Sequence, residues 1–86
     1  MPADGGGLPA DVLDPELFDR LRKLRKRIAD REGVAAFIVF SDASLRQMVA
    51  KKPKTRSGLL AVSGVGKVKL ERYGSEFLAA IRGEES

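Results

Sequence analysis

An all-α fold is predicted for this chain of 86 residues, as one small domain with a bundle of five helices. Apolar residues recur at helical spacing, and residues suited to begin or end a helix stand between these segments. Only one stretch has the apolar continuity of a buried strand. Because a lone strand has no partner, the core is expected to come from helices alone.

The first helix is expected to begin after Asp14 and to end at Gly33. Asp14 suits the N-cap, Pro15 suits the first helical position, and Glu16 favours the positive end of the helix dipole. Basic side chains occupy most of the helix circumference. A single apolar stripe runs along one side and consists of Leu17, Leu21, Leu24 and Ile28.

Residues 34–40, VAAFIVF, form an apolar run whose length fits a buried strand and a buried helical turn equally well. Since no second strand candidate exists, we interpret the run as a buried connector. Ser41 and Asp42 then offer N-caps to a second helix, which Pro53 stops. The apolar side of this second helix carries Leu45, Met48 and Val49.

Three shorter helices are expected in the rest of the chain. Thr55 caps the first of them, and Gly64 with Gly66 forms a turn into the next, which Gly74 closes. Ser75 then caps the last helix. The apolar residues assigned to the three are Leu59, Leu60 and Val62; Val68 and Leu70; and Phe77, Leu78 and Ile81.

The predicted domain spans residues 14–82. Residues 1–13 combine three successive glycines with two prolines and are expected to be a flexible linker or a cloning remnant. Residues 83–86 are expected to be a polar tail. No run approaches the roughly 20 apolar residues of a membrane span, and the first residues lack the pattern of a secretory signal.

The composition argues against most classes of enzyme. Cysteine, histidine and tryptophan are absent, which removes disulfides, the commonest metal ligand and the usual acid–base group near neutral pH. A nucleophilic Ser41 would need a base, and none is available. The chain is therefore expected to be non-catalytic, with no cofactor and no metal site.

The net charge of +4 is unevenly distributed. Residues 1–19 carry five acidic residues and no basic one, residues 20–56 carry a net charge of +9, and residues 57–86 are balanced. A concentrated positive segment attracts polyanions and speeds encounter with them, so nucleic acid is the first partner to consider. A solvated helix face is the plain alternative.

The acidic residues at the start of the domain have two explanations other than a role in catalysis. Asp14 and Glu16 suit the beginning of a helix, and isolated carboxylates without histidine or a pocket rarely catalyse reactions. Alternatively, Asp14, Glu16 and Asp19 dock the domain against another part of its parent protein or a partner, because opposed charged patches orient docking. This interaction module is the alternative function.

The stretch SGVGKVKLERYG, residues 63–74, raises the question of phosphate binding. A Walker A loop is excluded because Ala61 and Val68 stand at required positions, and a dinucleotide fingerprint is excluded because Lys69 replaces its third glycine. The remaining pattern resembles the hairpin of helix-hairpin-helix proteins, whose helix N-terminus meets a DNA phosphate. The alternative interpretation, which the pattern fits equally well, is that the two glycines only let the chain reverse its direction while Val65 fills the core.

Five pieces of the chain occur in a specific order: LRKLRKRIA, FIVFSDASL, Pro53, Thr55 and LLAVSGVGKVKLERYG. Together they closely resemble the helicase and RNase D C-terminal (HRDC) domain, in particular the form that ends bacterial RecQ helicases. The resemblance covers Leu17 to Ile81, about three quarters of the chain. It implies a five-helix accessory module without catalysis, with a short helical turn in the connector between the first helices. It also implies a mainly architectural double glycine, with Lys67 and Lys69 as secondary phosphate contacts.

Five positions depart from the family pattern, and one of them is Ser63, which replaces the usual proline before the first glycine of the turn. Ala35 and Ala36 stand where the family often has prolines, and Phe37 stands where it often has tyrosine. This corner is expected to be looser and to lose a hydroxyl, while the ring keeps a face able to stack on an unpaired base. Gly58 replaces the acidic residue that would complete a capping box with Thr55.

The resemblance implies accessory DNA binding as the function. The domain is expected to contact single-stranded or partial-duplex DNA beside the helicase core of its parent chain and to help regulate unwinding in DNA repair and recombination. It is expected to be monomeric in isolation, away from membranes, and cytoplasmic in association with the bacterial nucleoid. Carried over position by position, the expected DNA surface consists of Arg27, Arg31, Phe37, Lys51, Lys52, Lys54 and Arg56.

Overall fold

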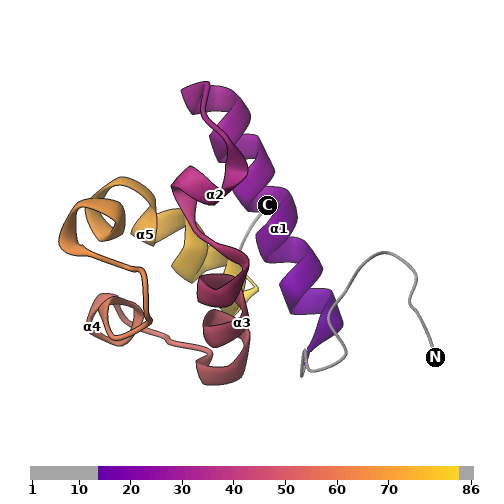
Figure 1. The fold of residues 1–86 in the computed structure, drawn as a ribbon. Coiled ribbons are helices and arrows are strands. Elements are labelled where there is room, and N and C mark those ends of the chain that lie inside the picture. Colours follow the sequence, from indigo (N-terminus) through magenta and orange to yellow (C-terminus); the bar gives the residue numbers. More distant parts are fainter. Residues whose placement is uncertain (1–13, 84–86) are drawn as a thin grey trace.

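The computed structural model describes residues 14–83, and this part of the chain is all-α, as predicted (Figure 1). The expected linker and nearly all of the expected tail lie outside the described residues. Helix α1 forms one side of the molecule; α2, α3 and α5 pack against it, whereas α4 lies on the opposite side and packs against α5. The helices are α1 (Pro15–Glu32), α2 (Ala36–Val39), α3 (Asp42–Lys51), α4 (Arg56–Leu60) and α5 (Lys67–Arg82).

Helix α1 begins and ends where the sequence predicts. The Asp14 carboxylate accepts a hydrogen bond of 3.1 Å from the backbone N–H of Leu17, and Pro15 is the first helical residue. Gly33 ends the helix in the left-handed conformation, with a φ of 72°. The predicted apolar stripe is buried, together with Phe18 and Ala29.

The connector forms the short helical turn α2, but it is only partly buried. Val39 and Phe40 are fully buried, whereas Phe37 is 68% exposed and Ile38 is 48% exposed. A single helical turn can place only one side against α1, so its other side faces solvent. The ring of Phe40 anchors the segment by packing edge-on against Phe77, with the ring centroids 4.9 Å apart.

Helix α3 begins at the predicted cap, where the Ser41 hydroxyl accepts from the backbone N–H of Ser44 at 3.1 Å. It ends at Lys51, and Lys52 follows in the left-handed conformation with a φ of 45°. The expected inward side of α3 is confirmed. Leu45, Met48 and Val49 are buried.

The expected division of the last part of the chain at Gly74 is wrong, because α5 continues through this residue. Gly74 is buried, and a Cβ atom there would lie 2.8 Å from Cδ1 of Leu70. The glycine thus leaves room for a neighbouring side chain instead of ending a helix. Val68, expected on an apolar side, is 68% exposed.

Side chains of α3 contact the glycine turn that precedes α5 and hold it in place. Gly64 has a φ of 88°, and a Cβ atom there would collide with the hydroxyl of Ser44. That hydroxyl donates to the carbonyl of Ser63 at 2.7 Å, while the Gln47 side chain accepts from the N–H of Ser63 at 3.0 Å. Val65 is buried below the turn. These contacts support the architectural interpretation of the two glycines.

Candidate nucleic-acid interface

Four of the predicted DNA contacts come together between α3 and α4. We call Lys51, Lys52, Lys54 and Arg56 the basic loop, because these four cations lie within six consecutive residues. Three of them, Lys51, Lys54 and Arg56, have no carboxylate partner among residues 14–83. The end of α5 lies beside the loop, since the Arg82 guanidinium donates to the Lys54 carbonyl at 3.2 Å.

The fourth cation of the basic loop is tied to the start of α1. The ammonium of Lys52 lies 3.3 Å from the carboxylate of Asp14. The pKa of Asp14 is lowered, first by the hydrogen bond from the Leu17 N–H and then by Lys52. Asp14 therefore serves as an internal partner of the basic loop, besides capping α1.

The other two predicted docking residues lie on the first turns of α1. Asp19 pairs with Lys23 at 3.0 Å, one turn along the same helix. Glu16 is exposed, and no ion pair joins it to another described residue. Docking through these carboxylates stays a prediction, with Glu16 as the member most available to a partner.

The two predicted contacts on α1 lie away from the basic loop. Arg31 donates to both carboxylate oxygens of Glu76 on α5, at 3.1 and 3.3 Å, and this partner raises the pKa of the guanidinium. Beside it, Arg72 donates to Glu32 at 2.6 Å, so that two ion pairs join α1 to α5. Arg27 is exposed and also interacts with a neighbour.

Phe37 offers an aromatic ring to solvent, unlike the other aromatic residues within the described part of the chain. Phe37 belongs to α2, which precedes the first residue of α3, whereas the basic loop begins at the last residue of α3 (Figure 1). Ten helical residues span about 15 Å. The predicted surface is therefore divided into an aromatic part and a basic part. The four buried aromatic residues are Phe18, Phe40, Tyr73 and Phe77.

Lys67 and Lys69 lie in the first turn of α5, directly after the glycine turn. Lys67 is exposed, whereas the ammonium of Lys69 lies 5.6 Å from the centre of the Phe40 ring. The N-cap of this helix is Gly66, which makes no side-chain hydrogen bond to the first backbone N–H groups. Lys67 is the freer of the two predicted secondary contacts.

Sequence reasoning missed the special position of Arg25. Its side chain is only 11% exposed, pairs with Asp42 at 2.8 Å and donates to the carbonyl of Phe40 at 2.9 Å. A signal existed, because Arg25 stands four residues after Leu21 and three before Ile28, next to the apolar stripe. This arginine joins α1 to the segment where α2 passes into α3.

Residues 14–83 meet neither the requirements of a metal site nor those of a membrane-spanning helix. Their carboxylates nowhere form a group of three that could hold a metal ion. None of the helices described is long and apolar enough to cross a membrane.

Comparison with known proteins agrees with this fold. Residues 14–81 match the HRDC domain family, and the chain belongs to that family. Domain 3 of the HRDC domains of D. radiodurans RecQ has a similar structure, with a TM-score of 0.78 and 36% sequence identity. The similarity covers 80% of this chain and 91% of that one.

Sequence relatives are DNA helicases much longer than this chain. The ATP-dependent DNA helicase RecQ of Pasteurella multocida is 48% identical over 69 residues, which cover 80% of this chain and 11% of the helicase. The ATP-dependent DNA helicase UvrD2 of Mycobacterium tuberculosis is 39% identical over 74 residues, or 86% of this chain and 10% of the helicase. The chain thus corresponds to about a tenth of these relatives, as an accessory domain.

Proposed function

We propose that this domain is a non-catalytic DNA-binding module of a RecQ-like helicase and that it holds single-stranded or partial-duplex DNA through the basic loop. The observation that carries the proposal is the gathering of Lys51, Lys54 and Arg56 without a carboxylate partner in the described chain. Elsewhere on the molecule, cations such as Arg31 and Arg72 are neutralised by ion pairs. A phosphate backbone gains most where positive charge is uncompensated.

Binding by the basic loop follows the charge of the DNA, not its base sequence. Lysine and arginine contacts to phosphates release counterions, and each neutralised phosphate on a single strand contributes about −0.7 to the slope of log affinity against log salt. Three to four contacts therefore give a slope of about −2 to −3. Contacts of this kind position the nucleic acid without selecting a sequence.

Phe37 adds a second contact in this mechanism. Its ring is available to stack on an unpaired base, whereas bases in a duplex are already stacked on one another. Because α3, which is about 15 Å long, lies between α2 and the basic loop, a single strand must be several nucleotides long to reach both. Short oligonucleotides are thus expected to bind through one contact only.

The parent protein inferred from the relatives is an ATP-dependent DNA helicase that acts in the bacterial cytoplasm. In it, this domain keeps DNA near the helicase core, and a second weak site on the same chain raises the local concentration of DNA there. The isolated domain is therefore expected to bind DNA only weakly.

The test is fluorescence anisotropy with labelled single-stranded, duplex and forked oligonucleotides at about 50 and 200 mM salt. The double variant Lys51→Ala/Lys54→Ala is expected to bind every sequence about tenfold more weakly. Its matched control, Lys23→Ala/Lys26→Ala, removes the same charge from two exposed lysines that are paired with carboxylates. Equal losses in both variants, or binding that is insensitive to salt, would contradict the proposal.

A further inference from the structure

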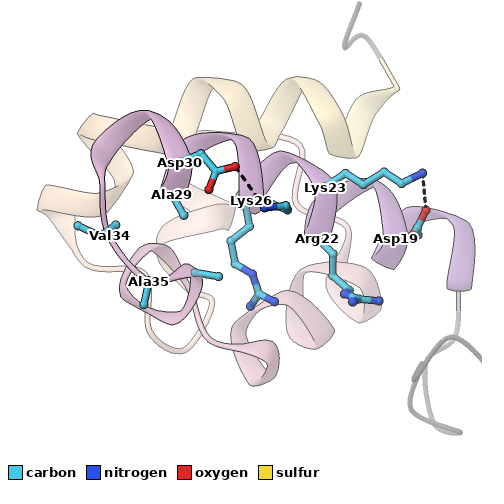
Figure 2. A pocket seen from close by; sticks show the side chains of 10 residues that line it. Asp19, Arg22, Lys23, Lys26, Ala29, Asp30, Val34 and Ala35 are labelled. Atoms are coloured by element: carbon cyan, nitrogen blue, oxygen red, sulfur yellow. Dashed lines mark hydrogen bonds and ion pairs between the residues drawn. The ribbon is translucent and has the colours of Figure 1, made fainter.

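A groove of about 580 Å³ lies along the flank of α1, next to the segment that joins α1 to α2 (Figure 2). One wall is polar and comes from side chains between Asp19 and Asp30 on α1. The far end is apolar and is formed by Val34, Ala35 and Ala36. Its volume lies within the range of about 300–1,000 Å³ that is typical of ligand sites. None of the predicted DNA contacts lines this groove.

Most of the charge in the groove is already neutralised. Lys23 pairs with Asp19 at 3.0 Å, and Lys26 pairs with Asp30 at 3.2 Å (Figure 2). Arg25 is engaged by Asp42 and by the carbonyl of Phe40. These pairs leave little attraction for a ligand with many negative charges.

Arg22 is the exception. This half-buried side chain lines the groove, and no hydrogen bond or ion pair joins its guanidinium to any other residue between positions 14 and 83. Figure 2 shows it extending away from Lys23 and from the carboxylate of Asp19. The groove therefore presents one available cation, on the side opposite its apolar end.

We propose that this groove binds a short peptide segment in which one carboxylate is followed within a few residues by an apolar side chain. The carboxylate meets the Arg22 guanidinium, whose planar set of donors matches two carboxylate oxygens at once. The apolar side chain covers Val34, Ala35 and Ala36. The partner is thus an acidic and apolar segment of another protein.

The charges of the groove favour a peptide over nucleic acid. Asp19 and Asp30 are eleven residues apart, so they lie about 16 Å from each other along α1. A phosphodiester chain through the groove would carry a charge at every nucleotide and would meet both carboxylates. A peptide with a single carboxylate avoids them. The apolar end also lacks a ring on which a base could stack, because its three residues are aliphatic.

The groove is separate from the ion pairs that join α1 to α5. Arg22 and Arg31 are nine residues apart, which is about two and a half helical turns, so they lie on opposite sides of α1. A peptide in the groove leaves the Arg31 pair with Glu76 undisturbed. None of the four basic-loop residues lines the groove, so the proposal stands or fails independently of DNA binding by that loop.

The experiment is NMR titration of the ¹⁵N-labelled chain with glycine–serine peptides that contain one aspartate and one leucine at several spacings. At least one peptide is expected to shift the Nε–H signal of Arg22 and the amide signals of residues 34–36. Replacing the aspartate by asparagine, or the leucine by serine, is expected to weaken binding.

Arg22→Gln is expected to lower the affinity about tenfold, as for the loss of a charge-assisted hydrogen bond. Its matched control is Arg46→Gln, because Arg46 is also half-buried and without a partner among the residues described, but lies on α3 outside the groove. Three results would overturn the proposal. They are the absence of shifts with every peptide, equal affinity of Arg22→Gln and the unchanged chain, and displacement of the peptide by a thymine oligonucleotide that shifts the same signals.

Discussion

The guanidinium of Arg25 donates to the backbone carbonyl of Phe40 at 2.9 Å and pairs with Asp42 at 2.8 Å. One side chain of α1 thereby fixes the point where α2 passes into α3. The Phe40 ring reaches from this point into the core against Phe77 and Tyr73. The contact connects the longest helix to the segment that presents Phe37.

Loss of this contact is expected to destabilise the fold. Arg25→Ala should lower the free energy of unfolding by about 2–3 kcal/mol, because it removes hydrogen bonds of a charged group and leaves a carbonyl without its donor. Urea denaturation followed by circular dichroism measures the change. Lys26→Ala, which removes only an exposed ion pair, should change it by less than about 0.5 kcal/mol. Similar losses in both variants would show that Arg25 has no special role.

The glycine turn offers a test with two neighbouring positions. Gly64→Ala is expected to destabilise the domain by about 2–3 kcal/mol, because the residue has a positive φ and its new methyl group would displace the Ser44 hydroxyl. Gly66→Ala should have a much smaller effect, since Gly66 has a φ of −93° and nothing lies within 4 Å of its Cβ position. Thermal unfolding of the two variants compares them directly. Equal effects would contradict the architectural role of Gly64.

Phe37 tests the aromatic part of the proposed interface. Because the ring is largely exposed, Phe37→Ala should leave stability nearly unchanged. The affinity for single-stranded DNA should fall about fivefold or more, as for the loss of one stacked base, while duplex binding changes little. Phe37→Tyr keeps the ring and serves as the control. A loss of affinity that is the same for duplex and single strand would exclude stacking.

The pair between Arg31 and Glu76 lowers the uncompensated positive charge on α1, where Arg31 is a predicted DNA contact. Glu76→Gln is expected to raise DNA affinity about two- to threefold at low salt, because it removes the carboxylate that neutralises Arg31. Glu71→Gln makes the same change of charge at an exposed position of α5 and is the matched control. Anisotropy titrations compare the two variants. If both gain equally, only net charge matters and Arg31 is not a contact.

Asp14 makes stability depend on pH in the acid range. Its pKa in the folded state is lowered from the ordinary value of 3.8 by the Leu17 N–H and by Lys52, so the charged form stabilises the fold. This contribution is fully present above that value and disappears as the pH falls through the lower pKa of the folded state. Asp14→Asn keeps a good N-cap but removes the charge. The difference in stability between the two proteins should therefore shrink in acid, and a difference that is constant with pH would contradict this account.

Features set by neighbours in the sequence were predictable, whereas features set by tertiary packing were not. The caps at Asp14, Ser41 and Thr55 follow local rules, and each forms its expected hydrogen bond. Gly74 has the sequence pattern of a helix end, but its role depends on the Leu70 side chain that covers it within a continuous helix. Rules based on neighbouring residues in the sequence do not predict which side chain packs over a glycine.

The same limit applies to the candidate site. The basic loop was predictable because its four cations are close together in the sequence. The neutralisation of Arg31 was not, since Glu76 stands 45 residues further along the chain. Likewise, the availability of Arg22 becomes evident only when Lys23, Arg25 and Lys26 are found with their partners.

The ion pair of Lys52 with Asp14 anchors the basic loop at the residue where the chain enters α1. Tension on the backbone at Asp14 would act first on the ion pair between Asp14 and Lys52 and only afterwards on the core. Such tension is expected to displace the basic loop without unfolding a helix.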